Sequence, residues 1–339
     1  MIARGHASLL LTALISGGCG FPDANQEYPV IQARVETDPV PSQDDAADDP
    51  AIWVNPQNPQ QSLLFGTDKK SGLMVFGLDG RQLQYLAAGR LNNIDIRPDP
   101  AAPEAASILA ASAREPSQVV LFRLDHATSE VSELARHDVD LENPYGICMT
   151  VLPNHTLNTV VTSQDGTVAQ FHIDETKNLT ETRRFKLATQ PEGCVIDDAS
   201  GQLYIGEEGR GIWLSSVRAD ATEPPTLFAD INDGMLEPDV EGLTLLQYGD
   251  RKLVLASSQG DNSYAAYDAA DGKHLVSFRV GDSTKIDGTQ ETDGIDAISI
   301  PLPGYPQGLL VVQDGVNTNP DAPQNFKLVS LEDVYSLIR

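Results

Sequence analysis

A weak internal repeat constrains what this chain can fold into more than any other feature of its sequence. Six times, a turn with an acidic, Asn or Gly residue leads into an alternating apolar run, and further apolar strands follow. The six units start roughly 44 to 52 residues apart, the spacing expected of a propeller blade with four strands. The motifs at the six starts contain Asp49, Asn93, Tyr145, Glu192, Glu241 and Asp293.

These units predict an all-β protein and, more specifically, a six-bladed β-propeller. The chain is rich in turn residues, with 27 glycines and 22 prolines, and long stretches of helical periodicity are hard to find. One blade cannot bury both of its faces alone, whereas a closed ring buries every blade against two neighbours. We expect residues 30–35 and 326–329 to pair in one blade and thereby close the ring.

The acidic residues at the repeat starts point to a metal site. The first strand of each blade is the innermost one, so the six starts are expected to meet at one end of the central channel. Carboxylates gathered there would repel one another strongly unless they were protonated or bound to metal. The acids concerned are Asp48, Asp49, Glu192, Asp239, Glu241 and Asp293.

Calcium is the ion that these side chains favour. Hard cations take oxygen ligands, and histidine is too sparse in these motifs to suggest zinc. The alternative interpretation is that each acid–glycine pair serves only as a turn.

A small cationic group stands against this acidic background. It comprises Lys69, Lys70 and Arg114, and carboxylates with metal beside such cations suit a bound anion. The formal net charge of −26 argues against nucleic acid, which requires a basic footprint, and against a polyanionic substrate unless cations intervene. The other interpretation of the three cations is solvated surface charge.

Several familiar hydrolytic chemistries have no counterpart in the sequence. Neither Cys148 nor Cys194 is followed at short spacing by the Arg of a phosphocysteine loop, and residues 136–138 (RHD) lack the glycine of a phosphohistidine motif. A Gly-x-Ser-x-Gly elbow and a Gly-rich nucleotide loop are also absent from the sequence. A covalent protein nucleophile is therefore not indicated, and water activated by metal remains.

The N-terminal segment predicts export. Arg4, the apolar run 9–15 and the small residues before Cys19 are similar to a bacterial lipoprotein signal, although Ser16 stands where Leu is usual. The predicted organisation is a signal at 1–19, a tether and first strand at 20–36, and the propeller domain at 37–339. We expect an outer-membrane or cell-surface lipoprotein, or a periplasmic or extracellular protein if Cys19 is not acylated. No later segment is long and apolar enough to span a membrane.

Cys148 and Cys194 leave two interpretations open. Both follow a turn that contains glycine and enter a strand-like run. They could form a disulfide in an exported protein, or they could be buried small apolar residues.

Seven short motifs resemble those of the β-propeller phytases, a family of calcium-dependent alkaline phytases. The likeness runs in order from about residue 37 to the C-terminus. The motifs are DDPAIW (48–53), KKSGL (69–73), LNNIDIR (91–97), PDVEGLT (238–244), ASSQG (256–260), TDGID (292–296) and QNFK (324–327).

This resemblance implies a six-bladed propeller that holds several calcium ions and hydrolyses phytate, myo-inositol hexakisphosphate, to lower inositol phosphates. The activity would be that of a phosphoric monoester hydrolase of the 3-phytase type, with two neighbouring phosphate subsites. The expected substrate is phytate as its calcium complex, and nucleic acid is not an expected partner. Contact with a membrane is expected only through a lipid on Cys19. The protein is expected to be a monomer.

The resemblance also assigns roles to individual residues. Active-site calcium would be held by Asp48, Glu192, Glu208, Asp239, Glu241 and Asp293, and more structural calcium by Asp49, Asp287, Asp314 and Asn317. Phosphate would be contacted by Lys69, Lys70, Arg114 and Tyr145, while Gln259 would bind substrate close to the metal cluster. The residues expected to take part in catalysis are Lys69, Lys70, Arg114, Tyr145, Glu192 and Glu241.

Two departures from the family pattern stand out. Gln164-Asp165 replaces a common Lys-Glu pair, so one phosphate-binding cation is lost, and Arg210 is expected to compensate for it. Val316 stands where a carboxylate ligand is usual, so the calcium beside it is expected to bind more weakly or to be absent.

Two other functions remain open from the sequence. One is a lactonase or esterase on a calcium propeller, a class that needs no paired lysines. The other is a non-catalytic surface propeller that binds an anionic ligand.

Overall fold

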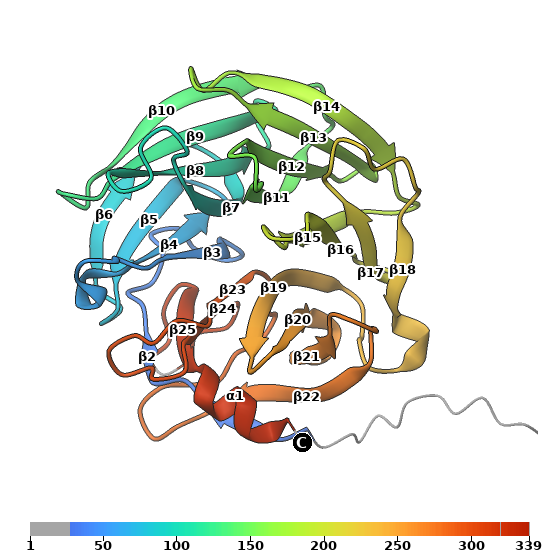
Figure 1. The fold of residues 1–339 in the computed structure, drawn as a ribbon. Helices are drawn as coiled ribbons and strands as arrows, with labels where there is room; N and C mark the ends of the chain where they lie inside the picture. The colour runs from blue at the N-terminus through green and yellow to red at the C-terminus, as the bar shows by residue number, and fades with distance from the viewer. Residues whose placement is uncertain (1–27, 319, 339) are drawn as a thin grey trace, which may run out of the picture.

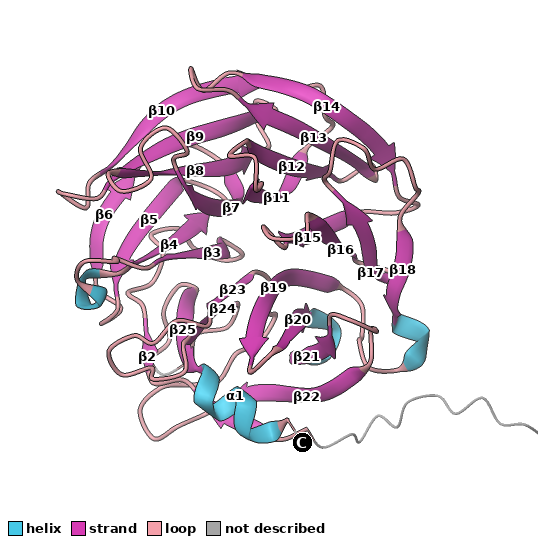
Figure 2. Cartoon of the chain, in the orientation of Figure 1, coloured by secondary structure: helices cyan, strands magenta, loops and turns pink. Residues whose placement is uncertain are grey.

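Six β-sheets stand around a common axis in the computed structural model, which describes residues 28–318 and 320–338 (Figure 1). The arrangement confirms the six-bladed β-propeller. Almost all regular structure is strand, and the few helical segments are short (Figure 2). The expected signal and Cys19 lie outside the described residues. Within those residues, no helix has the length and apolar character that crossing a membrane requires.

Blades 1 to 5 each take four consecutive strands, the first innermost. Blade 1 contains β3 (Ala47–Trp53), β4 (Leu63–Asp68), β5 (Gly72–Gly77) and β6 (Gln82–Leu86). Blade 2 contains β7 (Leu91–Pro98), β8 (Ala106–Ala113), β9 (Gln118–Asp125) and β10 (Val131–Asp138). Blade 3 contains β11 (Pro144–Val151), β12 (Leu157–Ser163), β13 (Thr167–Ile173) and β14 (Leu179–Lys186).

The second half of the ring follows the same plan. Blade 4 contains β15 (Pro191–Ile196), β16 (Gln202–Glu207), β17 (Gly211–Ser216) and β18 (Thr226–Asp230). Blade 5 contains β19 (Val240–Tyr248), β20 (Arg251–Ser258), β21 (Ser263–Asp268) and β22 (His274–Gly281). Blade 6 contains β23 (Ile295–Ile298), β24 (Leu309–Asp314), β25 (Asn325–Ser330) and the N-terminal β2 (Val35–Glu36).

The N-terminal segment closes the ring in a way that the sequence predicted only in part. β2 pairs antiparallel with β25, as expected, with Val35 opposite Leu328. β1 (Val30–Gln32), however, pairs in parallel with β22 of blade 5. The single strand expected at 30–35 is therefore two strands shared between two blades, because the chain crosses from one sheet edge to the next. The short helix α1 (Leu331–Leu337) follows β25.

The hydrophobic core lies between adjacent blades. Every residue of β8 is buried, and its side chains alternate between two clusters. Leu109 and Ala111 pack with blade 1, whereas Ile108 and Ala110 pack with blade 3. This two-sided burial explains why the second strand of each repeat is an uninterrupted apolar run rather than an alternating one.

The innermost strands carry a bulge at equivalent positions. Their pairing with the second strand slips after Ala47, Leu91, Pro144, Pro191 and Val240. The acid–glycine pairs Glu192-Gly193 and Glu241-Gly242 lie in such bulges, so interpreting them as turns is wrong. A bulge re-aims a side chain, and here glycine leaves room for the next blade, since a Cβ on Gly193 would lie 2.2 Å from the Glu241 carbonyl oxygen.

Candidate active site

Strand register defines an inner ring of six side chains at one end of the channel, which we call the mouth. Each inner-ring residue is the first residue of the bulge, or its equivalent before β23 in blade 6. Five of the six are buried, and the sixth, Tyr145, is half-buried. The inner ring consists of Asp48, Asn92, Tyr145, Glu192, Glu241 and Asp293, in the order of blades 1 to 6.

An outer ring is built from the residue that follows the second strand of each blade. Its chemistry differs sharply from blade to blade, with cations in blades 1 and 2 and an acid in blade 4. The outer ring consists of Lys69, Arg114, Gln164, Glu208, Gln259 and Gly315. The fold therefore brings together the expected acids and cations from all parts of the chain.

Lys69 is the centre of the cationic side of the mouth. Its ammonium nitrogen lies 2.8 Å from Asp45 Oδ1, 2.9 Å from Asp293 Oδ2 and 3.9 Å from Asp48 Oδ1. Burial lowers the pKa of Lys69, but these carboxylates outweigh it, so its pKa lies above the ordinary value. Lys69 is therefore a permanent charge at the floor of the mouth.

Arg114 and Tyr145 continue this side into blades 2 and 3. The Arg114 guanidinium carbon lies 5.1 Å from the centre of the Tyr145 ring. Arg114 Nε is buried without a hydrogen-bond partner, which leaves a donor free for an anion. The charge of Glu192, with burial, raises the pKa of Tyr145, so its hydroxyl remains a proton donor.

Three acids of blades 4 and 5, Glu192, Glu208 and Glu241, form what we call the acid trio. One carboxylate oxygen from each lies within 4.8 Å of the others. Burial, with neighbouring acids, raises the pKa of Glu241 to about 8, that of Glu208 to about 7 and that of Glu192 well above its ordinary value. In the described part of the chain, no Lys or Arg forms an ion pair with any of the three.

The residues at the mouth fit a calcium ion. Both carboxylate oxygens of Asp48, and Glu241 Oε2, are buried without a hydrogen-bond partner. Oxygens that share one calcium at about 2.3–2.6 Å lie at most about 5 Å apart, which the acid trio satisfies. The donor set consists of carboxylates and amides alone, which suits a hard cation and not zinc.

Asn92 belongs to the site, although it was not among the expected site residues. Its side-chain nitrogen donates to Glu192 Oε1 at 3.1 Å, and its side-chain oxygen is buried without a partner. The signal was its position, since Asn92 precedes the start of repeat 2 as Asp48 precedes the start of repeat 1. Gln259 donates to Asp293 Oδ1, an oxygen of one of the acids expected to hold calcium.

Three other expected residues lie at the rim or are otherwise engaged. Lys70 is exposed and donates to the Gln43 carbonyl oxygen, while Arg210 forms an ion pair with Asp230 at 2.9 Å. Asp239 is half-buried, and its charge raises the pKa of Glu208, so it lies beside the acid trio.

Gln164, the replacement for the family's cation, accepts a hydrogen bond from Asn143. The adjoining Asp165 forms an ion pair with Lys186 at 2.9 Å.

Three of the four expected structural calcium ligands, Asp287, Asp314 and Asn317, lie apart from the mouth. Asp287 and Asp314 surround the fully buried ammonium of Lys327, which also lies 2.7 Å from Glu36. Asn317 Oδ1 is buried without a hydrogen-bond partner, so an oxygen remains for a cation, but Asp314 Oδ2 already lies 3.2 Å from the Lys327 ammonium, which supplies part of the positive charge.

Asp49 lies beneath the inner ring and accepts a hydrogen bond from the Ile94 amide at 3.0 Å. Burial raises its pKa well above the ordinary value. It lines a chamber of about 50 Å³ in the channel, so a cation there would relieve a buried acid.

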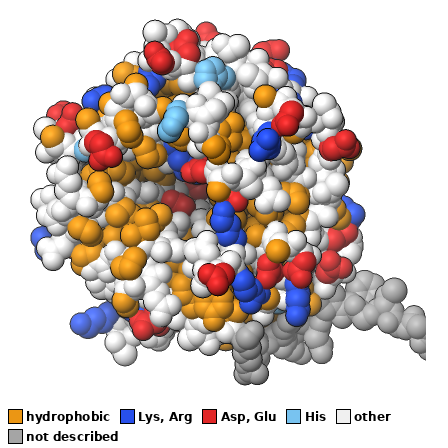
Figure 3. Space-filling view, in the orientation of Figure 1, with side chains coloured by type: hydrophobic (Ala, Val, Ile, Leu, Met, Phe, Trp, Pro, Cys, Tyr) orange, Lys and Arg blue, Asp and Glu red, His pale blue; other side chains and the backbone are white. Residues whose placement is uncertain are grey.

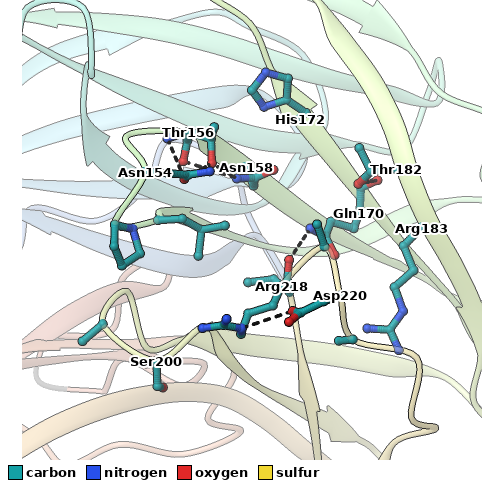
Figure 4. Close-up of a pocket in the computed structure, with 16 residues that line it drawn as sticks. Asn154, Thr156, Asn158, Gln170, His172, Thr182, Arg183, Ser200, Arg218 and Asp220 are labelled. Atoms are coloured by element: carbon teal, nitrogen blue, oxygen red, sulfur yellow. Dashed lines mark hydrogen bonds and ion pairs between the residues drawn. The ribbon is translucent and has the colours of Figure 1, made fainter.

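A second hollow in the described part of the molecule lacks the clustered acids of the mouth. A groove of about 720 Å³ lies between blades 3 and 4, and its polar groups bond to one another, as Arg218 does to Asp220 (Figure 4). The face drawn in Figure 3 is hollowed at its centre, with charged side chains around the hollow. The residues that line the groove between blades 3 and 4 include no member of the inner or outer ring.

Fold and site together define a β-propeller that presents clustered carboxylates and fixed cations to an anionic ligand. The family model described as Phytase matches residues 2–338, and the chain belongs to this family. The 3-phytase of Bacillus subtilis (strain 168) is 37% identical over 350 residues, which cover 97% of this chain and 91% of the relative.

Proposed function

We propose that this protein hydrolyses the phosphomonoesters of phytate with calcium as its cofactor, releasing orthophosphate and lower inositol phosphates. Family membership makes the chain a phytate-hydrolysing enzyme. The observation that carries the calcium dependence is the acid trio, which gathers three carboxylates without a cation among the described residues.

The cationic side and the acidic side of the mouth have different roles in this proposal. Lys69 and Arg114 bind the oxygens of the phosphoryl group and stabilise the charge that it carries during transfer. Tyr145, half-buried near them and Glu192, donates a hydrogen bond from its hydroxyl to a phosphate oxygen. Calcium held by Asp48, Glu192, Glu208, Asp239, Glu241 and Asp293 would supply positive charge at the phosphate and lower the pKa of a bound water.

Calcium also resolves the charge conflict between enzyme and substrate. The chain carries a formal charge of −26, and a hexaphosphate would be repelled from the acidic side of the mouth. Phytate that arrives as its calcium complex brings part of the required charge with it. The proposed reactant is therefore the calcium salt of phytate, acted on by an exported monomer whose N-terminal signal directs it out of the cytoplasm.

Phosphate release from phytate tests this proposal. Purified protein is assayed with calcium, with EDTA, and as the variants Glu241→Ala and Lys69→Ala. We expect release with calcium only, and a large loss in both variants. Turnover that persists after exhaustive chelation would contradict the calcium dependence. A non-catalytic binder would release no phosphate, and a lactonase or esterase would ignore phytate and open a lactone or cleave a carboxylic ester.

A further inference from the structure

Neighbouring blades are fastened at the channel by a side chain at one repeated position. The residue before the end of the second strand donates to a carbonyl oxygen at the start of the next blade's inner strand. Thr162 reaches the Glu192 oxygen at 3.2 Å, Ser257 the Thr292 oxygen at 3.0 Å and Gln313 the Ala47 oxygen at 3.2 Å. Thr67 and Ser112 make the same bond to the carbonyl oxygens of Asn92 and Tyr145.

The same five seams carry a second link, in most cases from the inner strand itself. Blade 3 is joined to blade 4 by the disulfide Cys148–Cys194, so the pairing left open by the sequence does form, between two buried residues. The other four seams use a side-chain oxygen that accepts a backbone amide of the neighbouring blade. These bonds are Asp49 to Ile94, Asp95 to Met149, Thr244 to Ala297 and Asp296 to Ile52.

The seam between blades 4 and 5 has neither link among the described residues. Glycine, Gly206, occupies the position of Thr162 and Ser257, and Val195 occupies the position of Asp95 and Thr244. Neither side chain can form a hydrogen bond. At its inner end, the described residues provide one backbone bond, from the Val240 amide to the Glu208 carbonyl oxygen at 3.2 Å, and the acid trio, with Glu192 and Glu208 from blade 4 and Glu241 from blade 5.

We propose that a cation bound by the acid trio is the missing cross-link of this seam, so that calcium fastens blade 4 to blade 5. The proposal rests on the calcium site proposed above and adds a mechanical role to it. One ion with ligands from both blades replaces the hydroxyl bond and the inner-strand link of the other seams. Without the ion, this seam lacks the ligand bonds from both blades, and any of the three acids that ionise repel one another across it.

The effect is confined to the inner end of the seam. Farther from the channel, Lys252 of blade 5 reaches Asp197 of blade 4 at 2.5 Å, and the Tyr204 hydroxyl reaches the Ala269 oxygen at 3.3 Å. The apolar contacts between the two blades are also intact, with Tyr204 and Val254 in one buried cluster. Removal of calcium therefore loosens β15 and β19 near the mouth and leaves the ring closed.

Hydrogen exchange of the full chain, followed by mass spectrometry with and without calcium, tests the proposal. We expect calcium removal to speed exchange by about 10-fold in peptides from β15 and β19, and by less than about 2-fold in peptides from β7 and β11, which form the seam between blades 2 and 3. Equal changes at both seams, or no change at either, would overturn it.

A matched pair of substitutions at Gly206 sharpens the test. A Cβ there would lie 3.2 Å from the Glu241 carbonyl oxygen, so the serine of Gly206→Ser can donate the bond that the other seams have, whereas Gly206→Ala adds the same crowding without a donor. We expect Gly206→Ser to reduce the effect of calcium on the exchange rates at β15 and β19. Gly206→Ala should leave that effect unchanged. The same response in both variants would count against the proposal.

If neither Gly206 variant folds, the opposite change, which removes a hydroxyl link from another seam, tests the proposal. Ser112→Ala removes the hydroxyl link of the seam between blades 2 and 3, and it should speed exchange at β7 and β11 whether or not calcium is present. Exchange there that is unchanged would show that such links do not control the seams. Calorimetric titration with calcium separates the two proposals. If calcium does not bind, the proposed cofactor is wrong. If calcium binds and phytate is hydrolysed, but calcium does not slow hydrogen exchange at β15 and β19, only the proposed cross-link is wrong.

Discussion

The two sides of the mouth solve the problem of buried charge in opposite ways. On the side of blades 1 and 6, Lys69 lies within 4 Å of Asp45, Asp48 and Asp293, so part of the acidity is neutralised from within the chain. On the side of blades 4 and 5, the acid trio has no such partner in the described residues. The chain itself supplies a counter-charge on the first side and none on the second, where we propose that a cation from solution supplies it, so the two should respond differently to metal, to pH and to substitution.

Glu241→Gln should have the largest effect. It removes one carboxylate from the acid trio and puts an amide of almost the same size in its place, so the trio loses its ligand from blade 5. We expect calcium affinity to fall and kcat/KM for phytate to drop by about 10³-fold. Calorimetry and phosphate release measure the two quantities. Glu104→Gln, at an exposed position, is the control, and a Glu241→Gln enzyme with normal calcium affinity would contradict the division between the two sides.

Loss of the disulfide should affect stability more than metal binding. Cys148→Ser with Cys194→Ser opens a cross-link between residues 46 apart in sequence, and such bonds contribute about 2–4 kcal/mol to stability. Denaturant unfolding should show a loss of this size. Because the seam of blades 3 and 4 retains its Thr162 bond, calcium affinity should stay within about 2-fold of the wild type. A large fall in affinity would show that the two seams are not independent.

Lys69→Met tests the side that is already neutralised. Removal of the ammonium takes away a phosphate ligand and leaves Asp48 and Asp293 without their buried counter-charge. We expect kcat/KM to fall by about 10²-fold, since removal of one preorganised donor has an effect of this order. Calcium affinity should not fall with it, because the acid trio is untouched. Lys273→Met, at an exposed lysine, is the control.

The acid trio predicts a dependence of calcium binding on pH. The pKa of Glu241 is raised to about 8 and that of Glu208 to about 7, so protons occupy these carboxyls at neutral pH and calcium must displace them. Calcium affinity should therefore rise by about 10-fold or more from pH 6 to pH 9, with protons released on binding. Titration in buffers of different ionisation enthalpy measures both. Lys69, whose pKa is raised, stays charged throughout this range and contributes nothing to the trend.

Much of this site could be predicted because the repeat converts sequence position into position on the ring. Asp48, Glu192, Glu241 and Asp293 follow from the repeat starts, and the continuous apolar second strands follow from burial on both faces. The bulges could not be predicted, since an acid–glycine pair has the same composition in a turn as in a bulge. Nor could the pattern indicate that Lys327 would lie among the acids expected to bind structural calcium, because only tertiary packing brings it there.

Arg210→Ala should have the smallest effect and would decide how far the cationic side extends. Arg210 follows Glu208-Gly209 in the turn after β16, on the acidic side of the mouth, and is expected to replace the cation lost at Gln164. In the structure it forms an ion pair with Asp230, and its side chain is 42% exposed, so a second phosphate group could recruit it only in competition with that acid. A solvated pair of this kind is weak, and we expect the Michaelis constant for phytate to rise by about 3-fold with kcat unchanged. An unchanged constant, matching that of the control Arg218→Ala, would remove Arg210 from the substrate site and leave blades 4 and 5 entirely dependent on calcium.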